Sequence, residues 1–330
     1  MEPALRAAVK RLPAALSRIS AYHFGWHNAA GTALTDPSSG KAVRPALAYL
    51  AAEALGGPPR CATPGAVAIE LVHNFALVHD DIMDGDIMRR NRPTLWKQFG
   101  TGPALLAGDG LHILAIDTLL SQHTDRARTA VSLLTRAMIA TLHGQAKDLG
   151  FTQRPWSGPA AVTPDEYRQA AAAKTGALIA CSTAVGAVLA GGHPRHVARF
   201  AAFGRHLGIA FQCTDDVIGL WGEPGRTGKP VGGDLLAARK TLPIIAALAS
   251  DTPAARGLLD LLSRGGEPLT ANDLPEALHL VDVAGGRAAA EAEAQRHMTA
   301  AIHALAPLRI SSQAREELNA MALYLTRRDR

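Results

Sequence analysis

Apolar residues recur with a helical period in most segments of this chain that are longer than a dozen residues, without the alternation that is typical of β-strands. Clusters of glycine and proline interrupt these segments at residues 56–59, 100–103, 152–164, 222–233 and 265–275. Residues 163–166 read Thr-Pro-Asp-Glu, a capping residue followed by a proline and an acid, which predicts the start of a helix. The sequence has no fixed-period repeat, which excludes a solenoid. It predicts an all-α fold of long helices packed as a bundle.

The size and composition of the chain agree with one helical bundle. Its 330 residues are near the upper limit of what one hydrophobic core usually organises. Apolar residues make up 48% of the chain and aromatic residues only 5%, a balance typical of packed helices rather than of a β-sandwich or barrel. We therefore predict a single domain over residues 1–330.

Charge and hydropathy limit the partners of the chain. The formal net charge is +5, but lysine and arginine are interleaved with acids, so we expect no nucleic-acid partner. The longest apolar run, residues 66–78, is interrupted by Glu70 and His73, and no transmembrane segment is predicted. The basic segment 5–19 is interpreted as an amphipathic helix with a solvated face rather than as a transit peptide.

Three cysteines, Cys61, Cys181 and Cys213, are far apart and lack the spacing of a zinc site. Their odd number argues against a disulfide framework. We expect all three to be buried thiols in a reducing compartment, and therefore a cytoplasmic protein.

A first acidic motif ends the otherwise apolar helix predicted over residues 69–86. Asp80 and Asp84 are one helical turn apart, so both carboxylates can reach one group of cations, whereas Asp81 points to the side. Carboxylates in an incomplete ligand shell suit Mg²⁺, which is commonly shared with substrate phosphates. Acids near a helix end are also common on solvated surfaces, so this motif alone does not establish a metal site.

A second acidic pair, Asp215 and Asp216, lies in the apolar helix predicted over residues 201–220. If the two helices run antiparallel across a cavity, the two sets of acids can hold three metal ions around one diphosphate. Two such pairs in one chain are much harder to explain as surface charge than one. We therefore expect both motifs to contribute to one diphosphate site.

Basic residues are grouped beside the acidic motifs and the helix breaks. A diphosphate that is held without metal needs lysine, arginine and hydrogen-bond donors. The chain offers such groups in addition to its acidic motifs, so it can bind two diphosphates. The basic candidates are Lys41, Arg44, Arg89, Arg90, Lys174, Lys229 and Lys240.

Seven short motifs occur along the chain in this order: Gly40-Lys41-x-x-Arg44-Pro45, Glu70-x-x-His73-Asn74-Phe75, His79-Asp80-Asp81-x-x-Asp84, Arg89-Arg90-x-Arg92-Pro93-Thr94, Lys174-Thr175-Gly176, Phe211-Gln212-x-x-Asp215-Asp216 and Thr227-Gly228-Lys229. Together they resemble the motifs of the trans-isoprenyl diphosphate synthase (polyprenyl synthetase) family over roughly residues 20–245. The resemblance implies an all-α fold around a deep central cavity, usually a homodimer, in which isopentenyl diphosphate is condensed with an allylic diphosphate.

The resemblance also implies a role for each matched residue. Three Mg²⁺ ions would be bound by Asp80, Asp84 and Asp215, with Asp81 and Asp216 in supporting positions. The allylic diphosphate would be held by Arg89, Lys174, Lys229 and Lys240, and isopentenyl diphosphate by Lys41, Arg44, His73 and Arg90. Thr175 and Gln212 would line the reacting carbons.

One position departs from the family pattern. The second motif commonly ends in a third aspartate, and here that position is Gly219. Because the resemblance assigns the direct metal contact to Asp215, we expect activity to survive with a weaker affinity for Mg²⁺.

The length of the product is predicted from the residues before the first motif. Phe75, five residues before Asp80, is bulky, and its neighbour Ala76 is small. By resemblance, this pair at the floor of the tunnel implies a C20 product, geranylgeranyl diphosphate. An ordinary core position for Phe75 and a C15 product, farnesyl diphosphate, stay open as alternatives.

Two other functions share some of these features. A class I terpene cyclase would have the helical fold and the first motif but would not need Lys41, Arg44, His73 and Arg90. A non-catalytic subunit of a heteromeric synthase would explain Gly219, but such subunits tend to lose the first motif, which is intact here.

Overall fold

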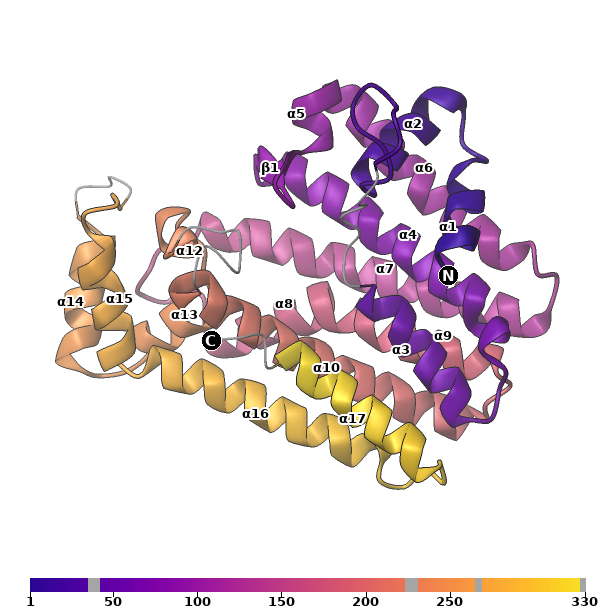
Figure 1. Ribbon diagram of the computed structural model, residues 1–330. Helices are drawn as coiled ribbons and strands as arrows, with labels where there is room; N and C mark the ends of the chain where they lie inside the picture. Colours follow the sequence, from indigo (N-terminus) through magenta and orange to yellow (C-terminus); the bar gives the residue numbers. More distant parts are fainter. Residues whose placement is uncertain (35–41, 223–230, 265–268, 327–330) are drawn as a thin grey trace. The chain divides into compact units, whose positions relative to one another are not determined.

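The structure of the chain is a computed structural model that describes residues 1–34, 42–222, 231–264 and 269–326 (Figure 1). Within these ranges its regular structure is helical except for two strands of two residues each, which confirms the predicted all-α fold. In chain order, the elements are α1 (Glu2–Val9), α2 (Ala14–His23), α3 (Val43–Ala54), α4 (Pro59–Met83), β1 (Met88–Arg89), β2 (Arg92–Pro93), α5 (Leu95–Phe99), α6 (Thr101–Leu120), α7 (Asp125–Thr152), α8 (Pro164–Ala171), the π-helix η1 (Ala172–Gly176), α9 (Ala177–Leu189), α10 (Pro194–Trp221), α12 (Gly233–Leu236), α13 (Leu242–Leu248), α14 (Pro253–Leu262), α15 (Leu274–Val283), α16 (Gly286–Leu305) and α17 (Ser312–Thr326).

Local signals place several helix ends as predicted. At α8, the side chain of Thr163 accepts from the backbone N–H of Glu166, and the Glu166 carboxylate accepts from the backbone N–H of Thr163, which completes a capping box. The helix of the first motif begins and ends earlier than expected, because α4 starts at Pro59 and ends at Met83 instead of continuing to residue 86. Gly85 follows with φ of 69°, a left-handed conformation that terminates helices and that glycine adopts without strain.

The chain divides into two compact units. The first comprises Met1–Met138, Cys181–Ala201 and Leu308–Leu318, and the second comprises Ile139–Ala180, Ala202–Pro307 and Asn319–Arg330. Neither unit is one continuous stretch of chain, so this division does not decide the prediction of a single domain.

In the first unit, α4 packs against α3 and α6. Gly108 on α6 allows the closest approach to the first acidic motif, because a Cβ at this position would overlap the ring of His79. A core cluster around Tyr22, Val78 and Leu95 joins α2, α4 and α5. The helix that carries the first motif is therefore supported by packing on several sides.

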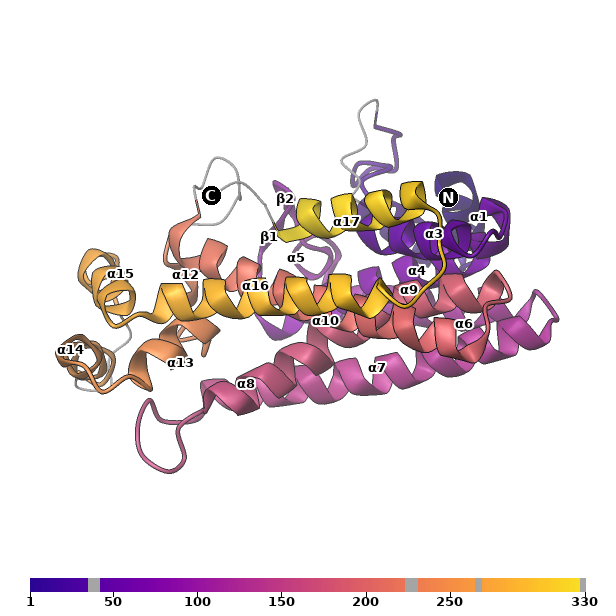
Figure 2. The same cartoon turned by 90° about the horizontal axis from the view of Figure 1, so that it is seen from below.

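In the second unit, α13 packs against α15 and α16, and α14 packs against α15 (Figure 2). One core cluster includes Tyr167, Cys213 and Leu242, so that α8, α10 and α13 share a buried interior. The predicted ligand Lys240 lies two residues before α13, and the last turns of α10 carry Gln212, Asp215 and Asp216, so this core holds predicted site residues in place.

The cysteines follow the prediction only in part. Cys181 and Cys213 are buried free thiols, and burial raises the pKa of each to about 12. The expectation of burial was wrong for Cys61, which is half-buried because it lies in the first turn of α4, at the edge of the core.

Three helical stretches are long and apolar enough to cross a membrane by length and composition alone: Pro59–Met83, Thr101–Leu120 and Pro164–Leu189. In the first and third, 61% and 72% of the most apolar window is buried inside the protein, whereas in α6 this share is 44%. The charged residues within these helices leave their hydropathy high enough for a membrane span. The lack of a transmembrane segment therefore stays a prediction.

Candidate active site

The first acidic motif occupies the end of α4, where its three carboxylates have different surroundings. Asp81 is buried, with 1% of its surface exposed, while Asp80 is half-buried and Asp84 is exposed. Oδ1 of Asp81 accepts from Nε of Arg89 at 2.8 Å and lies 2.6 Å from Nη2 of the same residue. Burial raises the pKa of Asp81, although the Arg89 hydrogen bond opposes this. Asp81 is therefore held by Arg89, a predicted diphosphate ligand.

A tight hairpin positions Arg89 and Arg90. Strands β1 and β2 pair antiparallel, and the two residues between them, Arg90 and Asn91, have φ of 50° and 60°. Positive φ at both central residues is the conformation that suits a two-residue hairpin turn, and it is uncommon for an arginine. After the turn, the guanidinium of Arg92 donates to the backbone oxygens of Tyr22 and His27. The hairpin is thus fastened to the end of α2.

The hairpin lines a small pocket rich in positive charge. Its lining includes Arg89, Arg90 and Arg92, together with His23 and Asp81. Burial and the neighbouring arginines lower the pKa of His23 to about 3, so this imidazole is neutral at physiological pH. Three arginines around one pocket form an arrangement that suits an anion with several charges.

His73 and Arg44, both predicted to hold isopentenyl diphosphate, are in direct contact. Nη1 of Arg44 lies 3.1 Å from Nε2 of His73. Arginine can only donate, so Nε2 accepts and the proton of the neutral ring lies on Nδ1. Burial lowers the pKa of His73 well below its ordinary value, and Arg44 and Arg90 add to this effect. Nδ1–H of His73 can therefore serve as a neutral hydrogen-bond donor to a diphosphate.

A buried polar chain that was not expected from the sequence lies beside these residues. Nδ2 of Asn74 donates to Oε1 of Glu70 at 2.9 Å, and its Oδ1 lies 3.1 Å from Nε2 of His23. Asn74 is fully buried and Glu70 almost so. Burial raises the pKa of Glu70, while Arg44 and Arg90 oppose the shift. These hydrogen bonds thus hold the buried carboxyl of Glu70 close enough to Arg44 and Arg90 for their charges to act on it.

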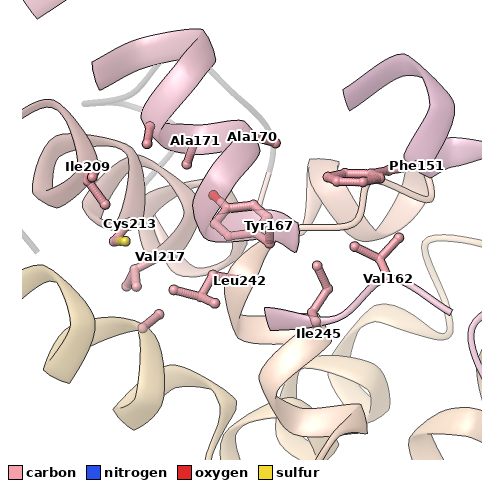
Figure 3. Packing of buried hydrophobic residues seen from close by; sticks show 12 residues of the cluster. Phe151, Val162, Tyr167, Ala170, Ala171, Ile209, Cys213, Val217, Leu242 and Ile245 are labelled. Atoms are coloured by element: carbon pink, nitrogen blue, oxygen red, sulfur yellow. The ribbon is translucent and has the colours of Figure 1, made fainter. Parts of the chain in front are cut away.

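In the second acidic motif, Asp216 is buried and Asp215 is half-buried, the same arrangement as in Asp81 and Asp80. Asp216 accepts from the hydroxyl of Tyr167, from Nε2 of Gln212 at 2.9 Å and from the backbone N–H of Leu242 at 3.0 Å. Figure 3 shows Tyr167 and Leu242 within this core. Burial raises the pKa of Asp216 to about 7 against these three donors. Asp216 therefore ties α8, α10 and α13 together.

Gln212 and Thr175, the predicted neighbours of the reacting carbons, are hydrogen-bonded. Oγ1 of Thr175 donates to Oε1 of Gln212 at 2.7 Å, while Nε2 of Gln212 donates to Asp216. The two bonds fix the orientation of the amide. One further lone pair of Oε1 stays available to a group with positive charge.

Lys174 and Thr175 lie on the π-helix η1, a rare conformation that is frequent at functional sites. Nζ of Lys174 lies 2.5 Å from Oδ2 of Asp148 on α7. Gly144 lets α7 approach closely, because a Cβ there would overlap the backbone of Lys174. Asp148 was not expected from the sequence, where an acid on a predominantly polar stretch of helix gives no signal.

Lys240 is placed differently from the other predicted diphosphate ligands. Only 6% of its surface is exposed, and its Nζ lies 3.1 Å from the centre of the Trp156 ring. Burial lowers the pKa of Lys240 to about 8. The predicted ligands Lys41 and Lys229 lie outside the described residues.

The departure at Gly219 has a structural counterpart. A Cβ at Gly219 would overlap the carboxylate of Asp234 on α12. A carboxylate therefore lies beside the position of the missing third aspartate, but it comes from a different helix. No sequence pattern indicates this, because the two residues are 15 positions apart across a helix break.

Phe75 lies on α4 in contact with two histidine rings. Its ring centre is 4.7 Å from that of His79 and 5.1 Å from that of His112 on α6. Both Phe75 and Ala76 are half-buried. Phe75 is thus a bulky group held between two helices, one turn before the acidic motif.

The acidic residues fit the chemistry of magnesium. Within the described ranges, no group of three or more His, Cys, Asp or Glu residues forms a ready-made metal cage. Mg²⁺ usually uses one or two carboxylates together with water and substrate phosphates, so such a cage is not needed. Asp81 and Asp216 are held by protein donors. The assignment of Asp80, Asp84 and Asp215 as metal ligands stays a prediction.

Comparison with known proteins agrees with these features. Residues 26–281 match the sequence profile of the polyprenyl synthetase family. A (2E,6E)-farnesyl diphosphate synthase of Mycobacterium tuberculosis is 43% identical over 99% of this chain and 90% of that protein. A geranylgeranyl diphosphate synthase of the same organism is 44% identical over 92% of this chain and 85% of that protein.

Solved structures lead to the same family. The crystal structure of a polyprenyl synthetase from Streptomyces coelicolor A3(2) is similar with a TM-score of 0.92 and 41% identity, covering 98% of this chain and 96% of that one. Because the profile covers most of the chain and the motifs occur in the family order, the chain belongs to the polyprenyl synthetase family and is a prenyl diphosphate synthase, a transferase of prenyl groups.

Proposed function

We propose that this prenyl diphosphate synthase condenses isopentenyl diphosphate with an allylic diphosphate and releases the C20 product geranylgeranyl diphosphate. The observation that carries the proposal is the common arrangement of the two acidic motifs. In each, one aspartate is buried and held by protein donors, while its preceding neighbour is half-buried. Such an arrangement serves a charged ligand better than it serves a hydrophobic core.

Asp80, Asp84 and Asp215 would hold magnesium, three ions in all. Magnesium supplies positive charge that offsets the charge developing on the departing diphosphate. Arg89, fixed by Asp81, and Lys174, fixed by Asp148, would hold the same diphosphate. Their anchoring carboxylates keep the two cations in place before substrate arrives, which reduces the reorganisation needed in the transition state.

The second substrate would be held without metal. Arg44, Arg90 and the Nδ1–H of neutral His73 are the donors for isopentenyl diphosphate, with Lys41 as a further predicted ligand. The carbonyl oxygen of Gln212, oriented by Thr175 and Asp216, would face the allylic cation. The proton lost after condensation would pass to the released diphosphate, since the motifs contain no isolated general base.

Three observations support the product length, the homodimer and the cytoplasmic location. The Phe75 ring, packed between His79 and His112, supports a tunnel floor that stops growth at C20. On α6, the exposed residues Leu106, Ile113 and Leu120 are spaced seven apart, which supports a helical face buried in a homodimer. Three free thiols support a reducing, cytoplasmic location.

The test is incubation of the purified protein with isopentenyl diphosphate, Mg²⁺ and each of the C5, C10 and C15 allylic diphosphates, followed by sizing of the products. Elongation to C20 from all three primers is the expected result. Products that stop at C15 would establish the farnesyl alternative. Cyclic hydrocarbons would indicate a terpene cyclase, and no product from any primer would favour a non-catalytic subunit.

A further inference from the structure

Lys240 is a buried cation with an unusual partner. A buried ammonium normally has a carboxylate or several oxygen acceptors, because loss of hydration is costly. Within the described ranges, Lys240 makes no ion pair or hydrogen bond through its side chain, and its Nζ lies over the ring of Trp156. The face of an indole ring is the best aromatic partner for a cation, and such contacts are stronger when desolvated.

The segment that carries Lys240 lies beside the second acidic motif. Two residues later, the backbone N–H of Leu242 donates to Asp216. A lysine in this position would be expected to turn toward the acids. The ammonium instead contacts Trp156 and leaves the two carboxylates to other roles. Asp216 ties helices together, and Asp215 is a proposed metal ligand.

The loop that carries Trp156 is held rigidly. Two residues before the indole, Arg154 donates to both carboxylate oxygens of Glu166 and to the backbone oxygens of Ala160 and Ala161. Glu166 also closes the capping box of α8, and Arg154 and Thr163 together lower its pKa to about 2. The ring of Trp156 packs against the core cluster that contains Leu220 and Leu235. The indole is therefore a fixed surface to which the flexible lysine adapts.

We propose that Trp156 is a positioning residue for Lys240: its ring holds the charged ammonium in the free enzyme and gives it up to the diphosphate of the allylic substrate. The inference rests on the proposed function. A multiply charged diphosphate attracts an ammonium more strongly than a neutral ring does, so the exchange runs toward the substrate. Without the ring, the buried ammonium would lose its partner, and Lys240 would bind the substrate less well.

The release of the Lys240 ammonium from the Trp156 ring can be followed by tryptophan fluorescence. Geranyl diphosphate and Mg²⁺ are added without isopentenyl diphosphate, so that no condensation takes place. The signal of Trp156 is obtained as wild type minus Trp156→Phe, and it should change on binding. Trp26, Trp96 and Trp221 stay in the Trp156→Phe variant, and its emission, which should stay constant on binding, is the internal control. Trp221 lies in the same unit as Trp156 and also has a cation near its ring, with Arg287 5.3 Å from the ring centre.

Kinetics test whether the ring acts through the lysine. Trp156→Leu should raise the KM for geranyl diphosphate about 3-to-10-fold, the scale of one cation–π contact, with kcat and the KM for isopentenyl diphosphate changed less than twofold. Trp156→Phe, which keeps an aromatic face and is the safer variant for folding, should lie between wild type and Trp156→Leu. In a Lys240→Met background, Trp156→Leu should have no further effect on the KM, as expected when two residues act as one unit.

Three results would count against the proposal in different ways. An equal rise in KM with and without Lys240 would mean that Trp156 contributes packing only, and the inference would be wrong. Calorimetric binding of geranyl diphosphate without a change in Trp156 emission would exclude the release. Absence of any calorimetric binding would overturn the proposed function itself, and the inference with it.

Discussion

Asp234 places its carboxylate directly over Gly219, in the space that a side chain at residue 219 would need. The missing third aspartate of the second motif and the position of α12 are therefore linked. Restoring the family residue by Gly219→Asp should not improve the enzyme, because the new side chain would displace Asp234 and put a second negative charge beside Asp216.

We expect Gly219→Asp to lower kcat/KM at least tenfold and to raise the Mg²⁺ concentration needed for half-maximal activity, measured by titration with Mg²⁺. Gly257→Ala is the matched control, because a Cβ at Gly257 on α14 meets only ordinary van der Waals contacts, and alanine favours the helix by up to about 1 kcal/mol. A gain in Mg²⁺ affinity in Gly219→Asp would show that the Asp234 carboxylate moves aside at no cost.

Asp80→Ala should abolish turnover, with a loss of at least a thousandfold, because the first motif would lose its half-buried carboxylate. The protein should still fold, since Asp81, not Asp80, makes the buried contact with Arg89. Product formation and thermal melting measured on the same preparation check both statements. Substantial residual activity would contradict the assignment of Asp80 as a metal ligand.

Asp148→Asn should raise the KM for the allylic diphosphate severalfold, because the neutral amide holds the Lys174 ammonium less firmly. The pair is only partly buried, with side-chain exposures of 27% for Lys174 and 46% for Asp148, so solvent weakens it and a larger effect is not expected. Asp251→Asn is the control: Asp251 also pairs with a cation, Arg256, but is fully exposed, and its KM should match wild type.

Asp216 makes the stability of the protein depend on pH. Its pKa rises from an ordinary 3.8 to about 7 on folding, so the folded state holds a proton that the unfolded state releases between these values. The resulting contribution to stability is complete below about pH 4 and is lost as pH rises through about 7.

In Asp216→Asn this contribution disappears, and the difference in unfolding free energy between pH 5 and pH 8 should shrink by about 1–3 kcal/mol. Urea denaturation of both proteins at the two pH values measures it. An unchanged difference would mean that the donors from Tyr167, Gln212 and Leu242 keep Asp216 ionised in the folded state.

Phe75→Ala should lengthen the product beyond C20, because removal of the ring opens space between α4 and α6 next to His112. Chromatographic sizing of the products after incubation with isopentenyl diphosphate checks this. Leu34→Ala, an exchange of a side chain remote in sequence from both acidic motifs, should leave the product unchanged. If Phe75→Ala also leaves it unchanged, the floor of the tunnel is formed by other residues.

Features that depend on neighbouring residues could be predicted from the sequence, whereas features that depend on distant residues could not. The capping box at Thr163 and the helix ends at glycine and proline follow from neighbouring residues, and the structure agrees with them. Asp148, Trp156 and Asp234 were missed because each acts on a residue at least 15 positions away. Their own sequence surroundings are those of ordinary polar helices and loops, so only tertiary packing reveals them.

The π-helical turn at Ala172–Gly176 widens one turn of an otherwise continuous helical stretch from Pro164 to Leu189. A wider turn takes up more residues, so the side chains before and after it follow two different angular phases. Tyr167 can thereby face Asp216 while Lys174 faces Asp148. Deletion of a single residue in this turn would restore regular α-helical geometry from Pro164 to Leu189. Lys174 would then no longer face Asp148, even if every catalytic side chain were still present.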